Sequence, residues 1–196
     1  LGRYGLDLVG GWYSSSLLVR DVDAEIEAMW PHLELLEAMG SRPFIIAETS
    51  NAIHGNRSRP LARSPVLGAE EWKRFGERMT RIADFIDGRG LKLAYHHHLG
   101  TVVETADELH HFIAATGDNV GLTLDTGHAA LGGIDPVSVI ESAPGRIAHV
   151  HCKDIRRPVF EALMARGGSF LDGVLEGMFT VPGDGNLEFA AIFNAL

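Results

Sequence analysis

The chain has 196 residues, of which 45% are hydrophobic and 22% are charged. This composition is typical of a folded domain and excludes a disordered chain, and no apolar run reaches the roughly 18–20 residues of a membrane span. The net charge of −9 argues against an extended nucleic-acid surface, since phosphate groups require a basic track. The single cysteine cannot form an internal disulfide, and the first residues lack a secretion-signal pattern. We therefore expect one domain over 1–196, located in the cytoplasm.

A short apolar strand, a loop and an amphipathic helix recur along the chain. Strands are predicted over 5–9, Pro43–Glu48, 91–96, 120–125 and 146–151. Helices are predicted over 21–39, 69–89, 105–116 and 136–143, and glycines follow the first three. Two further short helices are expected within 156–177, as an insertion of the kind that forms a lid, before a short strand that starts at Phe179. The alternating order predicts a parallel sheet and an α/β fold.

Two parallel architectures compete for this pattern. A doubly wound sheet usually carries a G-x-G-x-x-G loop after its first strand, and no such loop is present. Polar side chains instead gather at the carboxyl ends of several predicted strands, which is typical of a (β/α)8 TIM barrel. A complete barrel takes about 250 residues, so we expect a partial barrel that lacks N-terminal strands and the last β/α unit.

Histidines and carboxylates occupy the ends of the predicted strands. These ends carry Glu48, His96 to His98, Asp125 to His128, and His149 to Lys153. Strand side chains alternate between faces, so His96 and His151 can converge with Asp125 in the mouth of a barrel. Such a group is a site for Zn, Mn, Fe or Co, and the absence of thiolates favours Mn²⁺ or Co²⁺ over a closed structural Zn²⁺. As an alternative, Asp125 caps the helix that follows it.

Other side chains near these ends are further candidates for the site. Lys153 can bind a substrate oxygen or pair with a nearby acid, and His128 begins a loop from which it can reach a metal-bound substrate. Glu48 can be a ligand, an acid or base, or a hydrogen-bond anchor for a hydroxyl group. Trp12 and Tyr13 can form the floor of a polyol pocket or pack in the core.

The sequence resembles the xylose isomerase-like TIM-barrel superfamily and, within it, the inosose dehydratase family. The resemblance covers Leu6 to Gly185 and rests on the segments GLDLVGGWYSSSLL, ETSNAIHGNRS, LKLAYHHHLGTVVET, LTLDTGHAALGG, HVHCKDIR and SFLDGVLEGMFTVPGDG. The D-T-G-H and H-x-H-x-K-D motifs are shared widely in the superfamily. The triple histidine, GWYSSSLL and FTVPGDG are more specific to the inosose dehydratases.

The resemblance implies a divalent metal site. By position, Asp125 and His151 match the Asp and His ligands of the superfamily. His96 stands where the superfamily has its first Glu, which is a departure from the general pattern, and the second Glu falls beyond residue 196. The family implies Mn²⁺ or Co²⁺, with Zn²⁺ as a further candidate, and a dependence on glutathione.

The implied reaction removes water from 2-keto-myo-inositol in inositol catabolism. We expect His98 to act as the base, and His128 or Lys153 to stabilise the oxyanion or assist the leaving group. Glu48 would anchor substrate hydroxyl groups. Arg156 and Arg157 would hold the far edge of the ring.

Three other functions fit the same scaffold or the same residues. A ketose isomerase or epimerase needs the same metal and proton abstraction but no leaving group. A nuclease of the endonuclease IV type uses several metals and a basic rim, which the net charge of −9 disfavours. A polyol-binding protein without activity has no need for convergent His, Asp and Lys side chains. We expect a small polyol ketone as the substrate, no nucleic-acid or membrane partner, and leave a homo-oligomer open.

Overall fold

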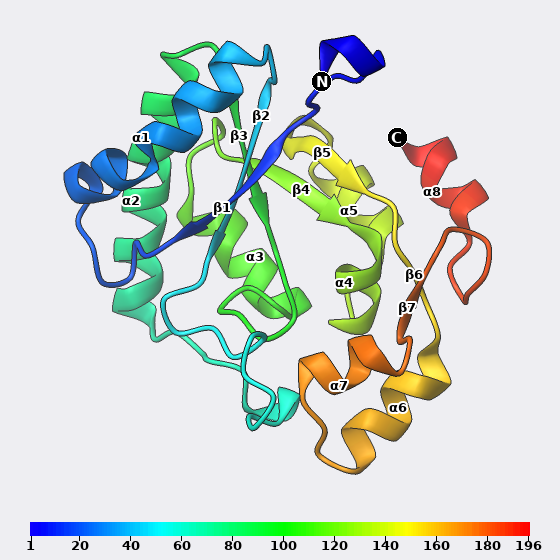
Figure 1. Ribbon diagram of the computed structural model, residues 1–196. Helices are drawn as coiled ribbons and strands as arrows, with labels where there is room; N and C mark the ends of the chain where they lie inside the picture. Colours follow the sequence, from blue (N-terminus) through cyan, green and yellow to red (C-terminus); the bar gives the residue numbers. More distant parts are fainter.

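Five parallel strands form one sheet whose spatial order follows the chain order (Figure 1). The structure is a computed structural model that describes all 196 residues. The strands are β1 (Gly11–Ser15), β2 (Pro43–Glu48), β3 (Lys92–His96), β4 (Gly121–Asp125) and β5 (Ile147–His151). A doubly wound sheet reverses its strand order at a switch point, whereas a barrel sheet does not. The uninterrupted order confirms the predicted α/β fold of the TIM-barrel type.

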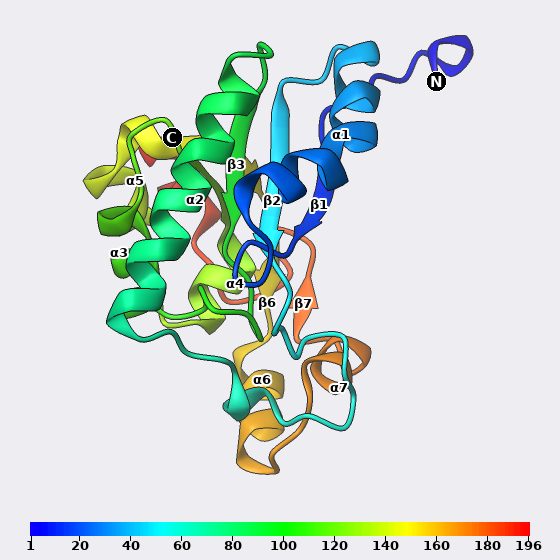
Figure 2. The ribbon, with the colours of Figure 1, turned by 90° about the vertical axis from the view of Figure 1, so that its left-hand side faces the viewer.

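The helices that connect the strands cover one face of this sheet. They are α1 (Val22–Ala38), α2 (Ala69–Asp87), α3 (Ala106–Ala115) and α5 (Pro136–Ser142), and α8 (Phe189–Ala195) packs on α5. Short 3-10 helices occupy Gly2–Tyr4, Leu61–Arg63 and Pro144–Arg146. Figure 2 shows α2 and α3 side by side along the sheet. None of the helices combines the length and apolar character needed to cross a membrane.

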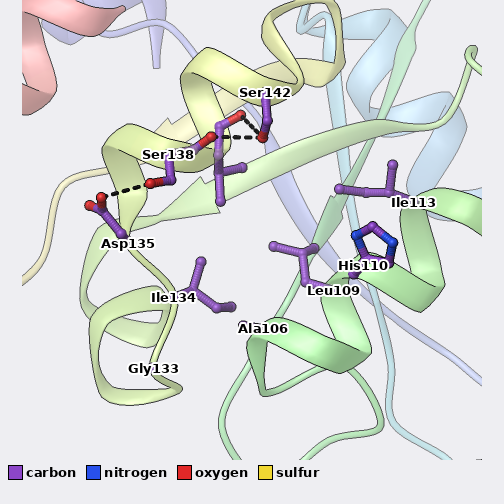
Figure 3. A pocket seen from close by; sticks show the side chains of 10 residues that line it. Ala106, Leu109, His110, Ile113, Gly133, Ile134, Asp135, Ser138 and Ser142 are labelled. Atoms are coloured by element: carbon purple, nitrogen blue, oxygen red, sulfur yellow. Dashed lines mark hydrogen bonds between the residues drawn. The ribbon is translucent and has the colours of Figure 1, made fainter.

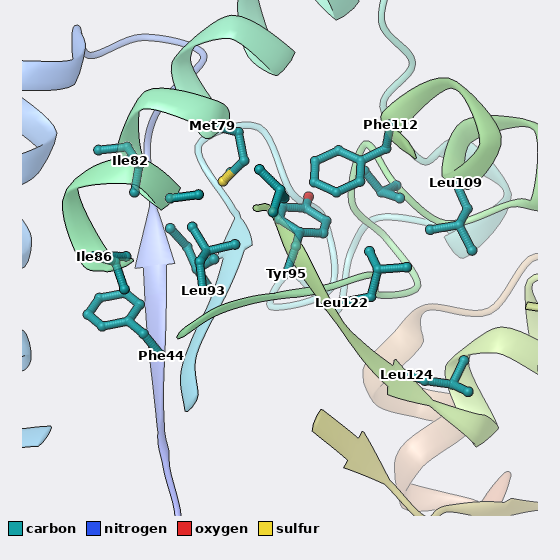
Figure 4. Packing of buried hydrophobic residues seen from close by; sticks show 14 of the residues in the cluster. Phe44, Met79, Ile82, Ile86, Leu93, Tyr95, Leu109, Phe112, Leu122 and Leu124 are labelled. Atoms are coloured by element: carbon teal, nitrogen blue, oxygen red, sulfur yellow. The ribbon is translucent and has the colours of Figure 1, made fainter. Parts of the chain in front are cut away.

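The main core lies between this helix layer and the outer face of the sheet (Figure 4). Alternate strand residues such as Leu93 and Tyr95 of β3 point to the same side, because successive strand side chains face opposite ways. They pack against residues of α2 that recur at three- and four-residue spacing, including Met79, Ile82 and Ile86, all fully buried. The apolar faces of the helices and of the strands therefore meet at one interface.

One predicted strand is wrong, and the others are displaced by a residue or less at their ends. The expected strand over 5–9 is irregular, and Leu6 and Val9 within it are 56% and 66% exposed. The first strand is β1 instead, and its half-polar sequence does not form an apolar run. Ser15 can nevertheless be buried there because its hydroxyl donates to Glu48 on β2 at 3.0 Å. A satisfied polar side chain thus occupies a position where the sequence pattern favours an apolar one.

A second layer of structure lies beyond the carboxyl ends of the strands. It contains α4 (Thr126–Leu131), α6 (Arg157–Ala165), α7 (Phe170–Leu175) and a two-stranded antiparallel sheet of β6 (Asp154–Ile155) and β7 (Phe179–Thr180). The two short helices predicted within 156–177 are confirmed as α6 and α7. A separate hydrophobic cluster forms under them from Leu61, Leu99, Ala130, Leu131, Ile155, Leu163, Phe170 and Met178.

Polar contacts fasten this insertion to the loop between β2 and α2. Arg57 of that loop pairs with Asp172 of α7 at 2.6 Å, and the Leu61 N–H donates to the carbonyl of Gly168 at 2.9 Å. The Ser169 hydroxyl caps α7. The insertion is therefore an ordered cover with its own small core, held over the carboxyl ends of the strands.

Candidate metal and catalytic site

The sheet register brings two of the predicted ligands to adjacent strands. Asp125 at the end of β4 is paired with His151 at the end of β5, and His96 of β3 is paired with Thr123, two residues before Asp125. Because side chains alternate, Asp125 and Thr123 point to the same face of the sheet. All three functional side chains therefore point away from the helix layer, into the concave side of the sheet.

Three ligand atoms from these residues converge on one point. His96 Nε2 lies 3.1 Å from His151 Nδ1 and 3.3 Å from Asp125 Oδ2, and His151 Nδ1 lies 3.4 Å from Asp125 Oδ2. Zinc bonds of about 2.0–2.1 Å in a tetrahedron separate the ligand atoms by about 3.3 Å. Two imidazoles and one carboxylate are also a donor set that first-row divalent metals accept. The predicted group His96, Asp125 and His151 thus fits a divalent cation in both chemistry and spacing.

Asp125 is held in place by its other oxygen. Oδ1 accepts the backbone N–H groups of Gly127 and His128 at 3.1 and 3.0 Å, so Asp125 is also the N-cap of α4. Burial raises the pKa of Asp125, but hydrogen bonds from His151 and His96 lower it more, and the pKa lies well below its usual range. The two readings of Asp125 are therefore compatible, since one oxygen caps the helix and the ionised group presents the other to the cluster.

Lys153 adds a cation to the same oxygen. Its Nζ lies 2.5 Å from Asp125 Oδ2, and Phe179 of β7 lies beneath the ammonium with its ring centre at 5.7 Å. The Lys153 side chain is 39% exposed, so it has room to leave Asp125. Gly127 permits this packing, because a Cβ atom there would come within 2.8 Å of Lys153 Cβ.

A pair of imidazoles, His98 and His128, lies beside the cluster. Their ring centres are 3.8 Å apart, and the ring of His96 is 5.6 and 5.5 Å from them. Burial and the neighbouring His96 hold the pKa of His98 well below 6.5, and burial and His98 do the same for the pKa of His128. Both rings are therefore neutral at physiological pH and can accept or donate a proton at nitrogen.

Aromatic side chains enclose this imidazole pair. Trp12 of β1 points into the concave side, with its ring 5.1 Å from that of His96 and 5.9 Å from that of His98. Phe170 of α7 lies 5.0 Å from His98 and stacks on His128 at 5.8 Å. The insertion thus supplies part of the wall around the site.

Sequence reasoning missed His54, Phe170 and Phe179 as members of this site. His54, in the loop after β2, lies 4.8 Å from His98 between ring centres, and its Nδ1 is buried without a hydrogen-bond partner. Its place just after a strand end is the signal that could have identified it. No local signal distinguishes Phe170 and Phe179 from core residues, because their role depends on how the insertion folds back.

Two predicted substrate residues, Tyr13 and Glu48, lie on the opposite face of the sheet. Tyr13 donates from its hydroxyl to Glu25 of α1 at 2.9 Å and packs on Phe44. Glu48 is fully buried, and both of its carboxylate oxygens accept hydrogen bonds, from the Ser15 hydroxyl and the N–H groups of residues 17 and 50. The expected polyol floor at Tyr13 and hydroxyl anchor at Glu48 are corrected: the alternation of strand side chains turns both away from the site.

Arg156 and Arg157 are not brought to the cluster either. The Arg156 guanidinium bonds to the carbonyl of Gly177, the hydroxyl of Thr180 and the carboxylate of Asp184, and so ties β6 to the segment around β7. Arg157 is exposed and is the first residue of α6. Arg156 is therefore engaged within the insertion and Arg157 lies on the surface, and their expected contact with the far edge of the substrate ring stays a prediction.

One surface hollow of the helix layer is unrelated to this site. It lies between α3 and α5, has a volume of 260 Å³, and is lined by residues such as Leu109, Ile113 and Ile134 (Figure 3). None of the predicted site residues lines it. The candidate site is defined by the strand ends and not by this hollow.

Comparisons with known proteins identify the family of the chain. The family model described as "Xylose isomerase-like TIM barrel" matches residues 3–196. The rhizopine catabolism protein MocC of Rhizobium meliloti is 45% identical over 196 residues, which are 100% of this chain and 60% of that protein. An inosose dehydratase of Clostridium perfringens is 36% identical over 193 residues, which are 97% of this chain and 65% of that enzyme. The chain thus spans somewhat less than two thirds of these relatives.

Solved structures show the same fold at low sequence identity. The crystal structure of the IOLI protein with a bound zinc atom is 18% identical with a TM-score of 0.67, and the match covers 96% of this chain and 62% of that one. The probable 3-DHS dehydratase AsbF of Bacillus anthracis is 16% identical with a TM-score of 0.64, over 97% of this chain and 65% of that one. From the family match over nearly the whole chain and the uninterrupted parallel sheet, the chain belongs to the xylose isomerase-like TIM barrel family.

Proposed function

We propose that this protein is a metal-dependent dehydratase that removes water from 2-keto-myo-inositol (scyllo-inosose) and yields a trihydroxycyclohexane-1,2-dione in inositol catabolism. Several relatives named inosose dehydratase, at 33–36% identity, support the substrate. The observation that carries the proposal is the convergence of three ligand atoms beside a neutral imidazole pair. A carbon acid next to a ketone needs this combination, a cation for the carbonyl oxygen and a base for the α-proton.

His96, Asp125 and His151 would hold the cation. A bound divalent metal supplies a Lewis acid that stabilises negative charge on the carbonyl oxygen. We propose Mn²⁺ or Co²⁺ for this role, with Zn²⁺ as the third candidate and glutathione as a further requirement to be tested. The spacing of about 3.3 Å between ligand atoms supports a first-row metal with bonds of about 2.0–2.1 Å.

The remaining side chains would bind the substrate and move protons. His98 takes the α-proton, because its ring is neutral and lies 5.6 Å from the ring of His96. His128 and Lys153 stabilise the oxygen on which negative charge develops. The exposed face of Trp12, 40% accessible, offers a flat apolar surface to the C–H face of a cyclohexane ring.

The site favours a small polyol ketone over a nucleic acid, because the chain carries a net charge of −9. We propose that residues 1–196 form one folding unit of a cytoplasmic enzyme. The lone cysteine, Cys152, supports a reducing compartment. Self-association is a further proposal, to be measured by sedimentation of the protein.

A direct test follows the ultraviolet absorbance of the dione. The full-length protein is incubated with 2-keto-myo-inositol after removal of metal, and then with Mn²⁺, Co²⁺ or Zn²⁺, with and without glutathione. We expect absorbance growth only when a metal is present. His110→Asn, an exposed change on α3, is the matched control and should behave as the wild type. Loss of the substrate to an isomer without absorbance growth would indicate an epimerase instead.

Rhizopine is tested as a second substrate, because the relative MocC has a higher identity to this chain than the inosose dehydratases do. MocC is named for rhizopine catabolism and is 45% identical, against 36% for the inosose dehydratase of Clostridium perfringens. Turnover of rhizopine and not of 2-keto-myo-inositol would move the proposal to that pathway. Metal-independent turnover of either compound would contradict the role of the His96 cluster.

A further inference from the structure

The main chain of Leu99 contacts both imidazoles of the His98–His128 pair. The Leu99 N–H donates to His128 Nδ1 at 3.2 Å. The Leu99 carbonyl oxygen lies 2.7 Å from His98 Nδ1. One residue thus approaches the two rings with a donor on one side and an acceptor on the other.

These two contacts require opposite tautomers. A backbone N–H can only donate, so His128 Nδ1 must be the unprotonated nitrogen and the ring proton must be on Nε2. A carbonyl oxygen can only accept, so His98 Nδ1 must carry the proton and Nε2 must hold the lone pair. An imidazole without a carboxylate partner carries one ring proton at neutral pH, so each ring has one proton to place, and the Leu99 contact decides where.

We infer that Leu99 is a positioning residue that divides the proposed chemistry between the two histidines, with His98 Nε2 as the base and His128 Nε2–H as a fixed hydrogen-bond donor. The inference rests on the proposed function for its chemistry, and on the two hydrogen bonds for the division of roles. Neither Nε2 atom has a hydrogen-bond partner in the protein, and His128 is only 2% exposed, so each ring keeps this nitrogen for a substrate that enters the enclosed site.

The loop that carries Leu99 is fastened on both sides, and these contacts hold its peptide groups in the orientation that fixes the tautomers. The His98 N–H donates to the carbonyl of Val103 at 3.0 Å, and the Gly100 N–H donates to Glu104 at 2.6 Å. The Gly100 carbonyl accepts the N–H of Ile53 at 2.8 Å. Gly100 adopts a φ of 80°, and an added Cβ would lie 3.0 Å from the backbone nitrogen of His54. The Leu99 side chain is itself buried in the cluster under the insertion.

The assigned protons balance a water elimination without a further reactant. His98 Nε2 takes the proton from the carbon next to the ketone, and the C–H electron pair becomes the double bond of an enolate. The β carbon–oxygen bond then breaks, and the departing hydroxide takes the same proton from His98 and leaves as water. His128 keeps its Nε2 proton throughout and donates a hydrogen bond to the oxygen that gains charge, as a neutral imidazole can. Both rings end in the tautomers in which they began.

Nitrogen NMR of the histidine rings tests the tautomers without any substrate. The protein is labelled with ¹⁵N at histidine and recorded free of metal and with Zn²⁺, and the spectra of His98→Asn and His128→Asn assign the two rings. We expect protonation at Nδ1 in His98 and at Nε2 in His128. The same tautomer in both rings, or the reverse pair, would overturn the inference.

Exchange of the substrate α-proton in D₂O tests the roles. His98→Asn keeps an amide donor for the Leu99 carbonyl but has no base, so exchange and dehydration should both fall by about 10²–10⁴-fold. His128→Asn keeps an acceptor for the Leu99 N–H but lacks the outer donor, whereas His128→Gln places an amide nitrogen near the Nε2 position. We therefore expect His128→Gln to retain more activity than His128→Asn, and His110→Asn to match the wild type. Wild-type exchange in His98→Asn would overturn the assignment of the base.

The two arms separate this inference from the proposed function. A wild-type protein that leaves 2-keto-myo-inositol unchanged would contradict the proposed substrate. The ring tautomers would then still be decided by NMR, because those spectra need no turnover. Protonation at Nδ1 in His98 and at Nε2 in His128 would support the division made by Leu99, and any other pair of tautomers would overturn it.

Discussion

Lys153 places a positive charge beside the ligand cluster, next to the carboxylate of Asp125. Its Nζ is 2.5 Å from Asp125 Oδ2, the same oxygen that lies 3.3 and 3.4 Å from the ring nitrogens of His96 and His151. A divalent cation at the three ligand atoms would have to share or replace this contact. We therefore predict that Lys153→Met increases the affinity of the protein for Zn²⁺.

The structure limits the size of this effect. A hydrogen bond to a charged group contributes about 1.5–3 kcal/mol, and solvent weakens this pair because the Lys153 side chain is 39% exposed. We therefore expect a gain of about 1–2 kcal/mol in the free energy of metal binding, which lowers the Kd about five- to thirtyfold. Repulsion between the ammonium and a bound cation acts in the same direction.

Competition with a chromophoric chelator measures the Kd of the metal-free protein for Zn²⁺ at neutral pH. Lys153→Arg keeps the charge and should stay near the wild type. Lys73→Met, an exposed change on α2, controls for the loss of a surface lysine. An unchanged or higher Kd in Lys153→Met would refute the reasoning, since it would mean that the ammonium does not oppose a cation at Asp125.

Three further predictions concern the cover and the helix side of the sheet. Phe170→Ala should lower the free energy of unfolding by about 3–5 kcal/mol, more than Phe170→Leu, because the ring is 8% exposed; equal losses in thermal melts would contradict this. Glu48→Gln should cost about 1–3 kcal/mol in urea unfolding, since an amide N–H must face a donor, and should leave the Kd for Zn²⁺ unchanged. Hydrogen bonds from Ser169 and Arg57 lower the pKa of Asp172 to about 2, below its unfolded value, so their stabilisation is present above about pH 4 and is lost as the pH falls toward 2. Hydrogen exchange in α7 should therefore accelerate over that range, and a flat profile would contradict the pairing.

The periodicity of apolar residues in the sequence was sufficient to predict most of the helices and strands. The strand Pro43–Glu48 is observed with the predicted bounds, and α2 ends two residues before its predicted end. Regular helical spacing and apolar runs report burial on one or two faces, which is why these elements are readable. The strand at Gly11–Ser15 is not, because its buried Ser15 is satisfied by a carboxylate on the next strand, a contact that no local pattern contains.

The candidate site likewise has features that the sequence predicts and features that it does not. Alternation within a strand predicted that His96 faces away from His97, and the placement of both agrees with it: His96 joins Asp125, while His97 is buried with neither ring nitrogen hydrogen-bonded. The same rule leaves open which face of each strand is the inner one. In the folded chain Trp12 lies on the inner face, beside the imidazoles, and Tyr13 lies on the outer face, against α1.

The sequence by itself determined the repeated strand–helix order, the family, and the residue types gathered at the strand ends. Those properties depend on local spacing and on motifs a few residues long. Only the tertiary structure decided the register that joins Asp125 to His151, the return of Phe170 over His98, and the contacts of Leu99 with both rings. These depend on packing between segments far apart in the chain, where the partner of each polar group is set by the fold and not by its neighbours in sequence.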